Sequence, residues 1–169
     1  VALIPAAILC DETITLANVS NISDVDALED ILKHLNAEIE RRDNGELYIS
    51  SSSIENKKID KKLAKKLRAS YYFMGALLGK YKKAEISYPG GCVIGSRPID
   101  FTLNSFKKMG VNIKEVDGHY SMKASKLEGT EIFFDVPSVG ATINVMISAV
   151  LAEGKTRIFA QNGVVCATN

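Results

Sequence analysis

Two apolar stretches decide the fold: VALIPAAILC at residues 1–10 and ASYYFMGALLGK at residues 69–80. Each is predicted to form a buried helix, and Ile8 of the first corresponds to Leu78 of the second, 70 residues later. Each is followed by the pattern of a strand, a second helix and a hairpin. The chain is therefore predicted to repeat one α/β unit.

Hydrophobic periodicity and turn residues place the elements of the two copies. The first copy has a predicted strand at 13–19, a helix at 25–35, and a hairpin of 37–41 with 46–50 around Asp43-Asn44-Gly45, a sequence typical of a type I′ turn. The second has a strand at 84–88, a helix at 99–109 ended by Gly110, and a hairpin around Asp117-Gly118. A helix at 144–152 and a strand at 156–158 begin a third, partial copy.

The repeat divides the chain into units of about 1–56, 57–128 and 129–169 within one incomplete domain. Residues 50–66 connect the first two units, and residues 123–136 connect the second to the third. In the first connector, lysines at 57, 58, 61, 62, 65 and 66 lie opposite Ile59, Leu63 and Leu67 in the pattern of an amphipathic helix. We expect this lysine face to be solvated, because aromatic residues are not interleaved with it.

One loop of the second copy is longer than its counterpart. Ile39 and Ile113 are 74 residues apart, whereas Ile8 and Leu78 are 70 apart, so about four residues are inserted between them. The insertion falls in PGGCVIGS at residues 89–96, where Cys92 lies between Gly91 and Val93 in a glycine-rich loop. Arg97 could lower the pKa of this thiol and favour a nucleophilic or proton-transfer role, whereas the alternative is an inert loop thiol. Cys10, on an apolar helix, is expected in the core.

Two predicted helix starts could bind an anion. Ser96-Arg97-Pro98 precedes one helix, and 137–142, with Ser138 and Gly140, opens the other. Together they favour a phosphate-bearing ligand, although each taken alone is equally a helix cap, with Arg97 solvated. Asp100 could accept hydrogen bonds from that ligand or could favour the positive end of its own helix. Arg68 is expected to face a cleft.

Composition excludes several classes of protein. The chain has 169 residues, 46% of them hydrophobic, and a net charge of +1. This composition disfavours disorder and a general attraction to nucleic acid or an anionic membrane. Its apolar stretch at residues 1–10 is too short to span a bilayer. Three cysteines suggest a reducing, cytoplasmic compartment. His34 and His119 are isolated and no nucleotide loop occurs, so we expect neither a metal site nor a cofactor.

These residues resemble a known family. RAS at 68–70, PGGCVIGSRPID at 89–100 and DVPSVGATINVMISAVLAEG at 135–154 are similar to the UDP-N-acetylglucosamine enolpyruvyl transferases (1-carboxyvinyltransferases), and the resemblance runs from residue 1 to 158. It implies an inside-out α/β barrel of βαβαββ units around buried helices. It also implies transfer of the enolpyruvyl group of phosphoenolpyruvate to the 3-hydroxyl of UDP-N-acetylglucosamine, with release of phosphate, as the first committed step of peptidoglycan synthesis.

The resemblance assigns roles to individual residues. Cys92 matches the proton donor that forms an adduct with phosphoenolpyruvate and is alkylated by fosfomycin. Arg68 matches an arginine that contacts substrate. The positions that match the nucleotide-sugar segment are Arg97, Pro98, Ile99, Asp100 and Phe101, and those that match a diphosphate-binding helix start are Ser138, Val139 and Gly140.

The sequence also departs from the family. A Lys-Asn pair expected before Val1 and a second domain with a catalytic aspartate and an arginine are not in the sequence, so we expect the chain alone to have little or no activity. Residues 159–169 do not match the expected continuation, and Val136 stands where some members have lysine. Two alternatives stay open: the sister enolpyruvyl shikimate phosphate synthases, which the GGC and SVGAT segments disfavour, and a non-catalytic module that binds a sugar nucleotide or a protein.

Overall fold

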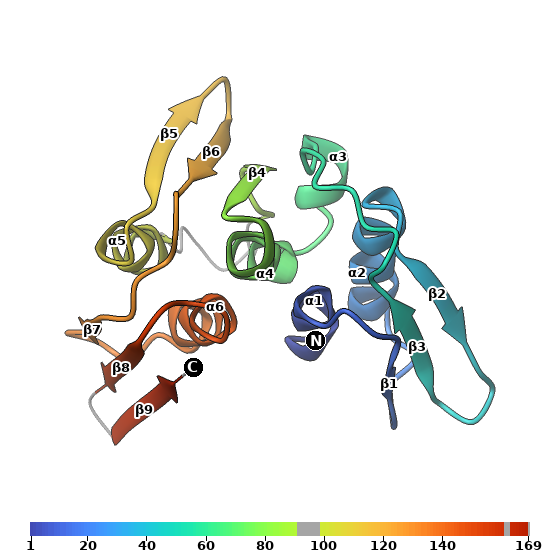
Figure 1. Ribbon diagram of the computed structural model, residues 1–169. Helices are drawn as coiled ribbons and strands as arrows, with labels where there is room; N and C mark the ends of the chain where they lie inside the picture. Colours follow the sequence, from blue (N-terminus) through green and yellow to red (C-terminus); the bar gives the residue numbers. More distant parts are fainter. Residues whose placement is uncertain (91–98, 161–162, 169) are drawn as a thin grey trace.

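Apolar helices lie at the centre of the molecule and sheets surround them (Figure 1). The computed structural model describes residues 1–90, 99–160 and 163–168. The central segments are α1 (Leu3–Ala6) with η1 (Ala7–Leu9), η2 (Arg68–Tyr71) with α4 (Tyr72–Tyr81), and α6 (Val139–Ala149). Helix α4 packs on both of the others and is buried along most of its length, as its apolar composition requires. This is the inside-out α/β arrangement that the family resemblance implies.

Helices α4 and α6 run parallel and in register. Tyr71 lies against Gly140, Gly75 against Asn144, and Gly79 against Ser148, so the contacts advance together along both helices. Glycine permits this approach: a Cβ at Gly75 would lie 2.5 Å from the carbonyl oxygen of Asn144. The starts of η2 and α6 therefore lie at the same end of the molecule.

Two antiparallel sheets have the same strand order and confirm the repeat. The first is β1-β3-β2, from β1 (Ile14–Leu16), β2 (Glu38–Arg41) and β3 (Leu47–Ser50), and the second is β4-β6-β5, from β4 (Lys83–Ser87), β5 (Asn112–Val116) and β6 (His119–Lys123). Helices α2 (Ser23–His34) and α5 (Asp100–Lys108) occupy equivalent places and end 74 residues apart. Ile14 and Ala84, which hold equivalent positions in the two registers, are 70 apart. The insertion therefore lies between β4 and the end of α5.

The third sheet differs from the elements predicted for the third copy. It contains β7 (Glu131–Phe133), β8 (Lys155–Ala160) and β9 (Gly163–Thr168), with β8 parallel to β7 and antiparallel to β9. The prediction placed β7 in a connector and found no element after residue 158. It gave the helix body as 144–152, whereas α6 spans Val139–Ala149 and begins at the helix start predicted separately at 137–142. Strands β7 and β8 pair across the whole of α6, and such distant pairing leaves little trace in local periodicity.

The lysine-rich connector does not form the predicted amphipathic helix. Only α3 (Lys61–Ala64) is helical there, and the side chain of Asp60 caps it by accepting a hydrogen bond from the Leu63 N–H at 3.0 Å. Ile59 forms a parallel bridge with Ile86 of β4 and is fully buried. The connector is thus held by the second sheet, and its lysine spacing does not reflect one continuous helix.

The two hairpin turns differ. The second turn lies at the predicted residues, and Asp117 (φ 45°) and Gly118 (φ 76°) both have positive φ, as a type I′ turn requires. In the first hairpin Gly45 has positive φ (79°) whereas Asp43 and Asn44 do not, and the Arg42 N–H donates to Glu46 O at 2.9 Å. The type I′ prediction for residues 43–45 is therefore wrong, because the glycine takes the left-handed position of a three-residue loop.

Candidate functional site

Arg68 and the start of α6 are brought together through Tyr71. The Arg68 guanidinium carbon lies 5.5 Å from the centre of the Tyr71 ring, within cation–π range. The hydroxyl end of the same ring lies over Gly140, where a Cβ would overlap the hydroxyl and lie 2.7 Å from Cζ. Tyr71 is 6% exposed, and burial raises the pKa of its phenol well above the ordinary range. Burial therefore opposes ionisation of a phenol that is already neutral at pH 7.

Helix α6 begins at the predicted anion-binding position. The Ser138 side chain caps it by accepting a hydrogen bond from the Ala141 N–H at 3.4 Å, and the Thr142 N–H donates to Ser138 O at 3.0 Å. Val139, the first helical residue, is 74% exposed. The first N–H groups of a helix have no partner within it, so this open end of α6 can receive an anion.

A buried amide holds this helix start in place. Asn144 is fully buried on α6; its Oδ1 accepts a hydrogen bond from the Gly75 N–H at 3.1 Å, and its Nδ2 donates to Gly140 O at 3.3 Å. One side chain thus connects α4 to the first turn of α6. Neither Tyr71 nor Asn144 is predicted from the sequence as a site residue, because no local pattern distinguishes them from ordinary helix residues.

The start of α5 lies at the same end of the molecule as the start of α6. Phe101 in its first turn makes an edge contact with Phe134, with ring centres 5.8 Å apart, and Phe134 shortly precedes α6. At the other end of the helix pair, the Ser148 hydroxyl lies 3.6 Å from Met109 Sδ. Ile99 is buried and Asp100 is exposed. A hollow of about 390 Å³, lined by Phe101, Asn104, Phe133 and Asp135 among others, lies between α5 and β7.

Cys92, Arg97 and Pro98 lie outside the described residues. Gly90, which precedes them, is held against the segment that carries Arg68: its N–H donates to Ala64 O at 2.9 Å, and a Cβ there would lie 2.6 Å from Lys65 O. The Ser70 hydroxyl donates to the same Ala64 oxygen at 2.7 Å. Cys10 is exposed, so its predicted core position is wrong: it follows η1 in an extended conformation that turns it out of the helical core.

A tyrosine pair adjoins β4 and the hairpin β5–β6. The Tyr88 and Tyr120 ring centres lie 5.0 Å apart, and the Tyr88 hydroxyl donates to the Glu115 carboxylate. This hydrogen bond is the main cause that raises the pKa of Tyr88 to about 12. Burial, with smaller contributions from Glu115 and Asp100, raises the pKa of Tyr120. The negative charge of Asp100 thus disfavours the ionised form of Tyr120.

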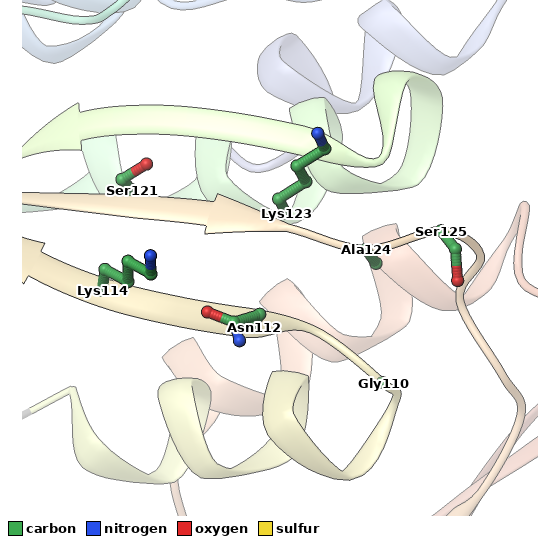
Figure 2. A pocket seen from close by; sticks show the side chains of 7 residues that line it. All are labelled: Gly110, Asn112, Lys114, Ser121, Lys123, Ala124 and Ser125. Carbon is green, nitrogen blue, oxygen red and sulfur yellow. The ribbon is translucent and has the colours of Figure 1, made fainter.

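A larger hollow, of about 500 Å³, is separate from these groups (Figure 2). It lies along β5 and β6 and is lined by Gly110, Asn112, Lys114, Ser121, Lys123, Ala124 and Ser125. It contains none of the predicted site residues, and both of its lysines are exposed. Size alone therefore does not identify the site.

The histidines do not form a metal site within the described part of the chain. His34 Nε2 lies 2.9 Å from Lys58 O, and His119 Nδ1 lies 3.2 Å from Lys58 Nζ. Both histidines are half-buried, and the described residues contain no cluster of three possible metal ligands. Nor does this part of the chain contain a helix with the length and apolarity needed to cross a membrane.

Sequence comparison gives one family and a consistent group of relatives. The family model described as EPSP synthase (3-phosphoshikimate 1-carboxyvinyltransferase) matches residues 1–167. A UDP-N-acetylglucosamine 1-carboxyvinyltransferase of Clostridium botulinum is 48% identical over 157 residues, which cover 92% of this chain and 38% of the relative. UDP-N-acetylglucosamine 1-carboxyvinyltransferase 2 of Bacillus subtilis is 45% identical, with 94% of this chain and 37% of the relative covered. The chain thus spans less than two-fifths of the length of these relatives.

Structure comparison supports the same fold. The enolpyruvyl transferase NikO of Streptomyces tendae matches 93% of this chain and 37% of its own, with a TM-score of 0.79 and 17% sequence identity. An EPSP synthase of Acinetobacter baumannii matches 96% of this chain and 39% of its own, with a TM-score of 0.72 and 16% identity. At these identities the likeness establishes the fold alone.

Proposed function

Because the chain belongs to the EPSP synthase family of carboxyvinyltransferases, we propose that it forms part of an enzyme that transfers the enolpyruvyl group of phosphoenolpyruvate to the 3-hydroxyl of UDP-N-acetylglucosamine. Phosphate is released, and the product enters peptidoglycan synthesis. The observation that carries this proposal is the junction of Arg68, Tyr71 and Gly140, which joins a cation to an open helix start. The names of the relatives favour UDP-N-acetylglucosamine over shikimate 3-phosphate as acceptor.

The proposed reaction needs a proton donor and a site for phosphates. The sugar hydroxyl loses its proton and its oxygen bonds to C2 of phosphoenolpyruvate while a proton is added to C3. Loss of a C3 proton then restores the double bond as the C2–O bond to phosphate breaks. We assign the donation of the C3 proton to Cys92, and the binding of the sugar-nucleotide diphosphate to Ser138, Val139 and Gly140 at the start of α6.

The remaining substrate contacts are assigned in the same way. Arg68 and Arg97 provide positive charge for the phosphates, and 98–101 bind the nucleotide sugar, with Asp100 as a hydrogen-bond acceptor and Phe101 as an apolar wall. We propose that a second domain supplies the base and completes the site, since the chain covers 38% of the Clostridium botulinum relative. The 169-residue chain alone is then expected to turn over little or no substrate. The odd number of cysteines supports a cytoplasmic location.

Fosfomycin labelling of the complete enzyme tests this function. Cys92 is expected to be alkylated faster when UDP-N-acetylglucosamine is bound, as followed by peptide mass spectrometry, with exposed Cys10 as the internal control whose labelling the nucleotide does not change. The variant C92S should lose the accelerated labelling. Acceleration by shikimate 3-phosphate instead would indicate the sister activity. Labelling that neither compound changes would favour a non-catalytic module.

A further inference from the structure

Tyr71 joins two groups that come from distant parts of the chain. Its ring lies beneath the Arg68 guanidinium, 5.5 Å from the guanidinium carbon, and its hydroxyl end lies over the first turn of α6 at Gly140. The ring of Tyr72 also packs against Tyr71, with ring centres 4.8 Å apart and an interplanar angle of 29°. Little freedom remains for Tyr71, which is 6% exposed.

Gly140 is the reason that Tyr71 fits. A Cβ at this position would overlap the hydroxyl oxygen, and the ring carbons Cζ and Cε1 would be 2.7 Å and 3.6 Å away. Any side chain at 140 must therefore displace the ring of Tyr71. The packing of Gly75 on Asn144 fixes the register of α4 and α6. A small slide of one helix along the other therefore cannot relieve the overlap between a side chain at 140 and the Tyr71 ring.

We propose that Tyr71 is a positioning residue for the sugar-nucleotide site: it holds the Arg68 guanidinium at a fixed place relative to the start of α6, and Gly140 is glycine to admit its ring. The inference rests on the proposed function, since the two groups that Tyr71 aligns are those assigned to the substrate phosphates. A rigid alignment of two such groups lowers the entropy that binding must overcome.

Steady-state kinetics of the complete enzyme test the inference through KM for UDP-N-acetylglucosamine. Y71F keeps the ring under Arg68 and should stay within about 3-fold of the unmodified enzyme, whereas Y71L removes the cation–π contact and should raise KM about 5- to 30-fold. G140A should raise KM at least as much by displacing the ring. The double variant Y71L/G140A should be no worse than the poorer single variant, because both changes act on the same contact.

A matched control separates positioning from stability. Tyr81 lies at the far end of α4, so Y81L should lower the melting temperature and leave KM unchanged. An unchanged KM in Y71L, or KM increases that multiply in the double variant, would overturn the inference and leave the proposed function standing. A lack of turnover of UDP-N-acetylglucosamine by the unmodified enzyme would overturn the proposed function, and this inference with it.

Discussion

Replacing Gly75 by alanine tests the close packing that aligns the site. Gly→Ala within a helix ordinarily stabilises a protein, by about 1 kcal/mol on helix propensity. At Gly75 a Cβ would lie 2.5 Å from the backbone oxygen of Asn144, 3.0 Å from its Oδ1 and 3.3 Å from its carbonyl carbon. Backbone atoms cannot swing aside as a side chain can, so α4 and α6 must separate.

The expected change in the free energy of unfolding of G75A is the balance of two costs and one gain. Overpacking costs about 1–3 kcal/mol, and loss of the hydrogen bond from the Gly75 N–H to Asn144 costs about 0.5–1.5 kcal/mol, against the gain of about 1 kcal/mol in propensity. We expect G75A to lower the free energy of unfolding by about 1–3 kcal/mol, which moves the midpoint of urea unfolding down by about 1 M. N104A, at an exposed position of α5, is the control and should be neutral or slightly stabilising. A higher midpoint in G75A would refute the close contact of the two helices.

Two further changes give expected outcomes. N144A removes both hydrogen bonds of a fully buried amide and should lower the free energy of unfolding by about 2–4 kcal/mol in urea titrations, and an effect as small as that of N104A would contradict the role given to this side chain. E115Q removes the carboxylate that raises the pKa of Tyr88 to about 12, so an ultraviolet titration should show this phenol ionising closer to 10.0. Folding favours the protonated phenol, so its contribution to stability is present below pH 10.0 and is lost as the pH rises through about 12. That loss should be smaller in E115Q, and identical titrations of the two proteins would show that the hydrogen bond does not shift the pKa.

The elements with strong local patterns could be predicted from the sequence. The buried helix at 69–80 and the hairpin at Asp117-Gly118 follow from an apolar stretch and from a pair of residues suited to positive φ. The repeat could be found as well, because the spacing of its residues is a property of the sequence alone. The offset of four residues located the longer loop between β4 and α5 before any contact was known.

What could not be predicted depends on contacts between distant residues. Strand β7 is short, and its partner β8 lies beyond α6 in the sequence. The lysine spacing at 57–66 resembles that of a helix, but the pairing of Ile59 with Ile86 outweighs local propensity. In the site, Tyr71 is by its sequence context one of three consecutive aromatic residues in a buried helix. Its contacts with Gly140 of α6 and with the Arg68 guanidinium distinguish it from Tyr72 and Phe73.

The spacing of the helix contacts explains why the candidate site forms at one end of the molecule. Tyr71 meets Gly140 and Gly75 meets Asn144, each pair 69 residues apart, while Leu9 meets Gly79 at a separation of 70. Helices that are copies of one unit and pack in parallel place their equivalent ends together, so the residues that precede them must gather there. The repeat alone would make those ends alike. The second copy differs by about four added residues between β4 and the end of α5, and α5 starts at this end, where a cation and an open helix start lie side by side.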